Sequence, residues 1–186
     1  MNGYDIALFF HLLALFAAFA ATALLGLAMR RVLTARTGGD ALQWLGLAKR
    51  TARVFPVALL TLVASGAAMV SERWSWSTPW VDAGLAGVVF LALVGDQVAG
   101  RRAAALAHEL ASDPAAPLPS RVRDPLWWAA SNANPGVALG VVFAMVTKPP
   151  APAAAAALIV GGLLGALTAV PLRRAGMPTA SLLSSD

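Results

Sequence analysis

The chain has 186 residues, the size of one ordinary domain, but 59% of them are hydrophobic and only 12% are charged. A soluble domain carries about a quarter charged residues, so this chain has too few to cover a water-exposed surface, and its mean hydropathy of +0.71 excludes a disordered chain. The absence of cysteine excludes disulfides, thiolate metal sites and cysteine nucleophiles.

Five segments are long and apolar enough to cross a hydrocarbon core about 30 Å thick, which needs about 20 residues of helix. The second is extended by the amphipathic stretch 41–49, and the fourth contains a polar patch. The sequence therefore predicts an all-α, polytopic transmembrane helical bundle that forms one domain. Its five spans are 6–29, 54–70, 81–98, 126–146 and 153–172.

The net charge of +5 is distributed unevenly between the two sides of these spans. Six Lys and Arg residues follow the first span, four follow the third and two follow the fifth, whereas the other side holds only Arg73 and Lys148. Because basic loops stay in the cytoplasm, this pattern predicts the N-terminus outside and the C-terminus inside a bacterial inner membrane. The positive charge then lies beside anionic lipid in the bilayer, and no nucleic-acid partner is expected.

His11 is the one ionisable residue within the first span. Phe9 and Phe16 point away from it on a helical projection and are expected to meet lipid. A polar side chain in a span usually faces the bundle interior, so we expect His11 to point toward neighbouring helices. The small residues within about 60° of His11 are Ala7, Ala14, Ala18, Thr22 and Gly26.

Two later spans carry small residues at every fourth position, which predicts close packing of helices in lipid. The same faces offer a route to a homo-oligomer. The rows are Gly136, Gly140 and Ala144 in the fourth span, and Gly161, Gly165 and Ala169 in the fifth.

Met69 and Met145 lie near the outer ends of their spans, in the same half of the membrane as His11. Histidine and methionine together suit Cu(I) or the axial positions of a haem iron. Asp82, at the outer start of the third span, is a candidate second-shell acceptor for His11. Alternatively, His11 bonds a neighbouring helix, the methionines fill gaps, and Asp82 complements its helix dipole and Arg73.

Asn132 and Asn134 form a polar patch beside Pro135 in the fourth span. They either line a cavity that binds a substrate or make interhelical hydrogen bonds beside a proline kink. Ser65 has no obvious partner base, so hydrolytic catalysis is not indicated. Whether the protein is an enzyme stays open.

Aromatic residues mark both expected membrane boundaries, as they do in many membrane proteins. At the outer boundary these are Tyr4, Trp74, Trp76 and Trp80, and at the inner boundary they are Trp127 and Trp128.

The motifs FFHLLALFAAFA around His11, LVASGAAMV, and VDAGLAGVVFLALVGDQVAGRR resemble a family of small bacterial integral membrane proteins of unknown function. That family is similar to the CopD-like and HemJ-like group, and the resemblance covers residues 1–111. It implies a helical bundle whose first-helix histidine, here His11, binds copper or haem b. The intramembrane basic residue of HemJ-like proteins has no counterpart, so their oxidase activity is not expected.

Three functions follow from these features. The leading hypothesis is an inner-membrane protein that binds haem b or copper through His11 in redox chemistry or metal handling. The small-residue rows favour a non-enzymatic accessory or structural membrane protein. The Asn132 and Asn134 patch favours a small-molecule transporter.

Overall fold

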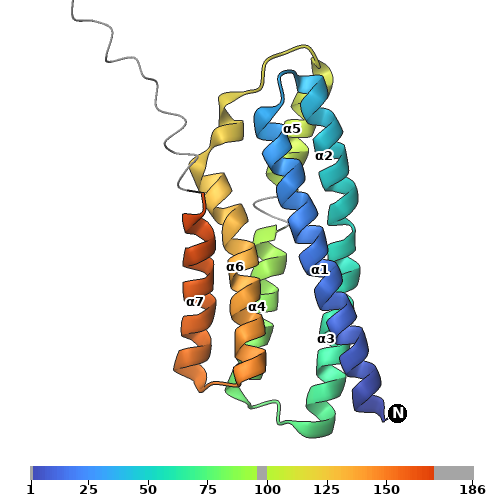
Figure 1. Ribbon diagram of the computed structural model, residues 1–186, viewed down its shortest axis with the longest axis vertical. Coiled ribbons are helices and arrows are strands. Elements are labelled where there is room, and N and C mark those ends of the chain that lie inside the picture. The colour runs from blue at the N-terminus through green and yellow to red at the C-terminus, as the bar shows by residue number, and fades with distance from the viewer. Residues whose placement is uncertain (1, 96–99, 170–186) are drawn as a thin grey trace, which may run out of the picture.

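The computed structural model describes residues 2–95 and 100–169, and every regular element in these residues is a helix (Figure 1). The all-α prediction is therefore confirmed for the described part of the chain. The elements are α1 (Gly3–Thr34), α2 (Gly38–Ala52), α3 (Val54–Arg73), α4 (Pro79–Val94), α5 (Arg101–Ser112), the short 3-10 helix η2 (Ser120–Arg123), α6 (Pro125–Thr147) and α7 (Ala151–Leu167).

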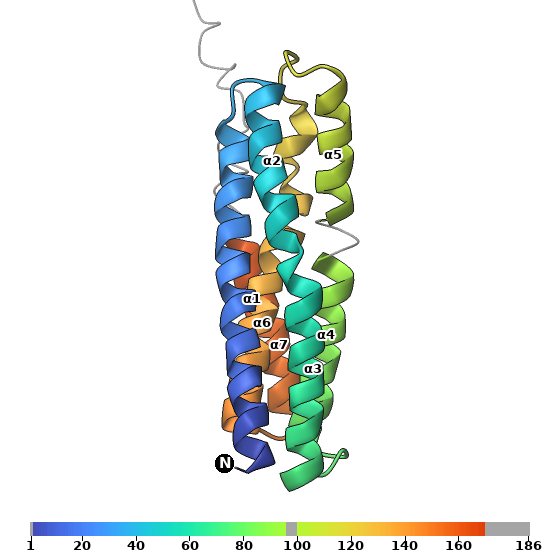
Figure 2. The same ribbon diagram turned by 90° about the vertical axis from the view of Figure 1, so that its right-hand side faces the viewer.

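α1 and the nearly continuous pair α2–α3 form a long antiparallel hairpin (Figures 1 and 2). α1 has 32 residues, which is about 48 Å at 1.5 Å per residue and exceeds the hydrocarbon thickness of a bilayer. α2 and α3 meet at Arg53, which keeps right-handed helical dihedrals. Pro56 has no N–H to donate to the Ala52 carbonyl, which explains the interruption at this point.

α4, α6 and α7 form a second group, with α6 and α7 antiparallel and α4 packed against both (Figure 1). The two groups are joined by a buried hydrophobic cluster at the end of the molecule where α1 finishes. The buried members of this cluster come from α1, α2, α5, η2 and α6, and are Val32, Ala41, Leu45, Leu106, Leu110, Val122 and Trp127.

Three helical stretches are long and apolar enough to cross a membrane: Gly3–Thr34, Gly38–Arg73 and Pro125–Thr147. α4 and α7 are also apolar but shorter, with 16 and 17 residues. Residues 96–98 of the predicted third span and 170–172 of the predicted fifth span lie outside the described residues. The fold is therefore that of a helical protein with at least three candidate membrane spans.

Large apolar side chains cover the outside of the hairpin, as lipid contact requires. Phe9 and Phe16 are 60% and 71% exposed, in agreement with the predicted direction of these two rings. Leu60 on α3 is 71% exposed and belongs to the same surface. A soluble monomer does not tolerate a contiguous apolar surface of this kind.

The buried stripe of α1 repeats every seven residues, at Ala14, Ala21 and Ala28. This spacing keeps small side chains against an antiparallel neighbour over the whole helix, which allows a close approach. The stripe is centred about 80° from His11, so the predicted inward face was partly wrong. Gly26, predicted on the inward face, is exposed and has open space where a Cβ would lie. The Thr22 hydroxyl donates to the Ala18 carbonyl at 2.8 Å, as expected of a threonine in a span.

The glycine rows of α6 and α7 face one another, which confirms the predicted close packing. A Cβ at Gly136 would overlap the Gly161 carbonyl, and a Cβ at Gly165 would overlap the Asn132 carbonyl. A Cβ at Gly140 would lie 2.5 Å from the Ala157 oxygen, closer than real Cβ contacts come. The two backbones therefore touch along most of their length, at a separation that only glycine permits.

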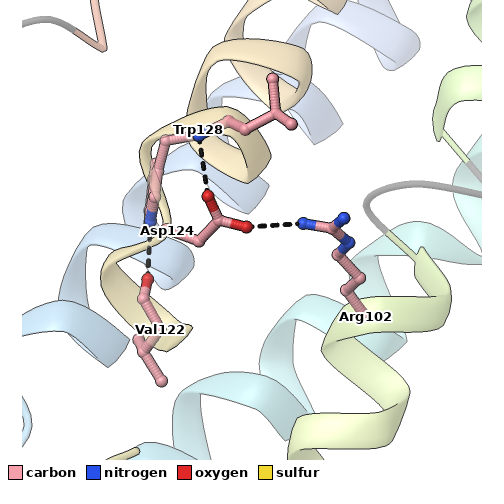
Figure 3. Close-up of polar contacts among 5 residues, drawn as sticks. Arg102, Val122, Asp124 and Trp128 are labelled. Carbon is pink, nitrogen blue, oxygen red and sulfur yellow. Dashed lines mark hydrogen bonds and ion pairs between the residues drawn. The ribbon is translucent and has the colours of Figure 1, made fainter. Parts of the chain in front are cut away.

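Trp127 and Trp128, predicted to lie at the inner membrane boundary, are 5% and 6% exposed and are therefore covered by protein. Both are covered because α5 and η2 extend the bundle at this end and supply protein contacts. The Trp128 indole N–H donates to the Val122 carbonyl at 2.8 Å, and Asp124 accepts from the first turn of α6 while pairing with Arg102 at 2.9 Å (Figure 3).

Candidate functional site

His11 lies on α1 and packs against α3. Its Nδ1 is 3.1 Å from the hydroxyl oxygen of Ser65, and the ring lies over Gly66, where a Cβ would be 3.5 Å from the imidazole. The residue is half-buried. The imidazole therefore faces a neighbouring helix, as the sequence predicted, although it faces α3 alone rather than the centre of a five-helix bundle.

The hydrogen bonds of Ser65 determine which nitrogen of His11 carries the proton. The Ser65 hydroxyl is 2.5 Å from the Thr61 carbonyl and 3.3 Å from the Leu62 carbonyl. Both oxygens are acceptors only, so the single hydroxyl hydrogen of Ser65 goes to the closer one, Thr61. The remaining contact requires His11 Nδ1–H to donate to Ser65.

This tautomer leaves a lone pair on Nε2 of His11. The side-chain hydrogen bond of the ring joins Nδ1 to Ser65, and the Leu62 backbone also hydrogen-bonds the imidazole. Nε2 is not among the fully buried polar atoms without a partner in the described part of the chain. A neutral imidazole with an oriented Nδ1–H and an accessible Nε2 is the form in which histidine binds a metal or haem iron.

A groove of about 410 Å³ runs between α1 and α3 from Ser65 toward the start of α1 and the end of α3. The groove is open and is lined by small residues, Gly3 and Ala7 on α1 and Ala64 and Ala68 on α3, together with the larger Ile6 and Leu60. Phe10 closes one side. The Ser65 hydroxyl and Thr61 supply its polar lining, so the groove is an apolar recess whose polar groups belong to the His11 network.

The two candidate methionine ligands lie in different helix groups. Met69 is on α3, one turn beyond Ser65 toward the outer end, and is half-buried. Met145 is on α6, and its methyl group lies beside Gly84 of α4. No cluster of three His, Asp or Glu side chains that could hold a metal ion occurs within the residues that the structure describes.

Asp82 is exposed in the first turn of α4, where it complements the helix dipole. The acceptor that orients His11 is Ser65 rather than Asp82. From the sequence, Ser65 had no obvious partner base. The sequence did contain one signal for this pairing. His11 lies seven residues from Tyr4, and Ser65 lies nine residues from Trp74. Because both aromatic residues were predicted at the same membrane boundary, His11 and Ser65 could be expected at similar depth.

The Asn132 and Asn134 patch does not interrupt its helix, because α6 continues through Pro135. The Asn132 backbone is packed against Gly165 of α7. The side-chain nitrogen of Asn134 lies toward Gly95, at 3.3 Å from the position a Cβ would take there, and its Oδ1 is the unpartnered buried atom noted above. The patch is therefore part of a packed helix interface on the α4 and α7 sides.

Cation–π contacts join the helices at the end of the molecule where α1 begins, and the sequence gave no sign of them. The Lys148 ammonium lies 4.0 Å from the ring centroid of Trp74 and 5.9 Å from that of Trp80, and the two rings are edge to face. Arg73 lies 3.9 Å from the Tyr4 ring. Lys148 ends α6 in the left-handed region, with φ of 50°, and this conformation directs the chain into the turn before α7.

Comparisons with protein families, with curated proteins and with solved structures find no match to this chain. The resemblance to the CopD-like and HemJ-like group therefore stays a prediction. The residues of the α1–α3 hairpin supply the support for the function proposed next.

Proposed function

We propose that the chain crosses a bacterial inner membrane five times, with its N-terminus outside, and binds haem b or copper through Nε2 of His11. α4 and α7 are about 24 and 26 Å long, close to the hydrocarbon thickness. α7 packs along α6, which is itself a candidate span. The asymmetry of Lys and Arg favours the same topology.

The observation that carries the ligand assignment is the chain of hydrogen bonds from His11 through Ser65 to the Thr61 carbonyl. Ligating histidines almost always donate their second ring nitrogen to a fixed acceptor, which sets the tautomer and the ring orientation. Here the fixed acceptor is the hydroxyl oxygen of Ser65, which lies on the neighbouring helix α3.

The donor set fits haem b more readily than copper. Haem iron needs one axial nitrogen, with the sixth position open or filled by His11 of a second copy. Copper(I) prefers two or three soft donors, and Met69 is the one candidate that shares a helix with Ser65, whereas Met145 packs on α4. Bound haem would supply one-electron redox chemistry; this chain would orient the imidazole through Ser65. The neighbouring groove shares Ser65 with this network, but His11 does not line it.

The direct test is the absorption spectrum and copper content of protein purified in detergent after expression with added haem precursor and copper. We expect a Soret band, or stoichiometric copper, in the wild type. His11→Ala should abolish the signal, and Ser65→Ala should weaken binding about 10- to 100-fold. His108→Ala is the matched control, because His108 is exposed on α5; equal loss in this variant, or a wild type with neither group bound, contradicts the proposal.

A second candidate is a non-enzymatic accessory or structural membrane protein. The backbone contacts between α6 and α7 favour it, since they fill this interface with glycine and alanine rather than with functional side chains. It predicts a colourless, copper-free protein whose stability changes little in His11→Ala. A transporter built on Asn132 and Asn134 has less support, because α6 is continuous there and its backbone is packed against α7.

A further inference from the structure

A second recess, of about 270 Å³, lies at the opposite end of the hairpin from the groove near His11. It is formed where α1 ends and α2 begins, and its character is polar. The residues that define its chemistry are Arg31, Thr34, Arg36, Asp40, Gln43 and Trp44.

The recess carries uncompensated positive charge. Arg31 and Arg36 both face it, and neither forms an ion pair with any of the residues described by the structure. The Arg31 guanidinium lies 5.8 Å from the Trp44 ring centroid, which holds it at the recess by a cation–π contact. Asp40 supplies one carboxylate against two guanidiniums, and its place in the first turn of α2 is explained by the helix dipole.

The depth of the recess matches the headgroup layer of a bilayer. From Ile6 to Leu27, both exposed apolar residues, α1 rises about 32 Å, which is one hydrocarbon thickness. Arg31 follows about 6 Å later, within the headgroup layer of about 5–8 Å. Arg36 follows the C-cap residue Ala35, just beyond the end of α1, and lines the same recess.

We propose that this recess binds the phosphate group of an anionic lipid headgroup, with Arg31 and Arg36 as the phosphate ligands. Two guanidiniums suit a phosphate because each presents paired N–H donors that match two of its oxygens. Basic pockets between membrane helices on the cytoplasmic side recognise such headgroups. The assignment to the cytoplasmic leaflet rests on the proposed topology and is independent of what His11 binds.

The test measures binding of phosphatidylglycerol to delipidated full-length protein in detergent, by native mass spectrometry and by the shift in melting temperature. Phosphatidylcholine, glycerol phosphate and inorganic phosphate are titrated in parallel. The key variant is Arg31→Gln/Arg36→Gln. Its charge-matched control is Lys49→Gln/Arg50→Gln, because these two residues of α2 are exposed and do not line the recess. In the antiparallel hairpin they lie at about the depth of Leu27 on α1, which is nearer the bilayer than the recess.

The expected result is saturable binding of phosphatidylglycerol that falls about tenfold or more in the Arg31/Arg36 variant and less than about twofold in the control. Equal weakening in both variants indicates diffuse attraction and overturns the proposal, as does an absence of saturable binding. Glycerol phosphate or inorganic phosphate binding as tightly as the lipid overturns the lipid assignment. His11→Ala should bind lipid as the wild type does, so that loss of haem or copper with intact lipid binding counts against the His11 site alone.

Discussion

Adding one methyl group at Gly136 should destabilise the protein more than the same change at a lipid-facing glycine. In Gly136→Ala the new Cβ meets the Gly161 carbonyl and approaches the Gly165 nitrogen at 3.1 Å. These are backbone atoms, so no side-chain rotation relieves the contact. α6 and α7 must separate, which weakens their contact along the rest of the glycine row.

The magnitude follows from two opposing effects. Overpacking of a close-packed interface costs about 1–3 kcal/mol, and replacing glycine by alanine within a helix returns about 0.5–1 kcal/mol. Taking the middle of both ranges, the net expectation for Gly136→Ala is a loss of about 1 kcal/mol of stability. Gly26→Ala is the matched control, because the position is helical and nothing lies within 4 Å of a Cβ there.

The assay is reversible unfolding in mixed micelles, followed by circular dichroism, on the wild type and the two alanine variants. We expect Gly136→Ala to unfold at lower denaturant and Gly26→Ala to match or exceed the wild type. If Gly136→Ala is as stable as Gly26→Ala, the two backbones do not touch at this point and the reasoning about the α6–α7 interface is refuted.

Three further variants test other contacts. Ser65→Ala removes the acceptor of His11 and should lower the free energy of unfolding by about 0.5–1.5 kcal/mol. In a double-mutant cycle with His11→Ala, the two losses of stability should be non-additive. Additive losses would show that the pair does not interact. Trp128→Phe leaves the Val122 carbonyl unpaired, costs about 1–3 kcal/mol and should speed proteolysis of the segment 113–119, whereas unchanged cleavage contradicts its role. Lys148→Gly should be about 1 kcal/mol more stable than Lys148→Ala, because only glycine adopts the left-handed conformation without penalty, and both can be ranked by thermal unfolding.

Periodicity and small-residue spacing predicted the helices and the α6–α7 contact well. Predictions of this kind succeed because they depend on hydrophobic length and on local spacing, both of which are written in the sequence. The direction of Phe9 and Phe16 was likewise predictable from the helical projection of α1. The extension of the second span by α2 was also predicted, from the amphipathic stretch 41–49, whereas the length of α1 beyond residue 29 was not.

Contacts between distant segments could not be predicted in the same way. The burial of Trp127 depends on α5 and η2 returning over the start of α6, which local sequence does not reveal. The pairing of His11 with Ser65 depends on the register of the α1–α3 hairpin, and a shift of one helical turn would have placed Thr61 or Met69 opposite the imidazole. The sequence therefore pointed to the histidine and offered Asp82 as either its acceptor or a complement to a helix dipole, but it gave Ser65 no partner.

The number and direction of membrane crossings underlie both the outer-half site and the lipid recess, and the absence of cysteine makes them directly measurable. Single cysteines are introduced at Ser77, Ser112, Pro149 and Ser184, the last of which lies outside the described residues, and are labelled in intact cells with a membrane-impermeant maleimide. The account predicts labelling of Ser77→Cys and Pro149→Cys from outside, and protection of Ser112→Cys and Ser184→Cys until the cells are opened. Labelling of positions 77 and 112 from the same side, or of 149 and 184 from the same side, would show that α4 or α7 does not cross and would contradict the five-span account.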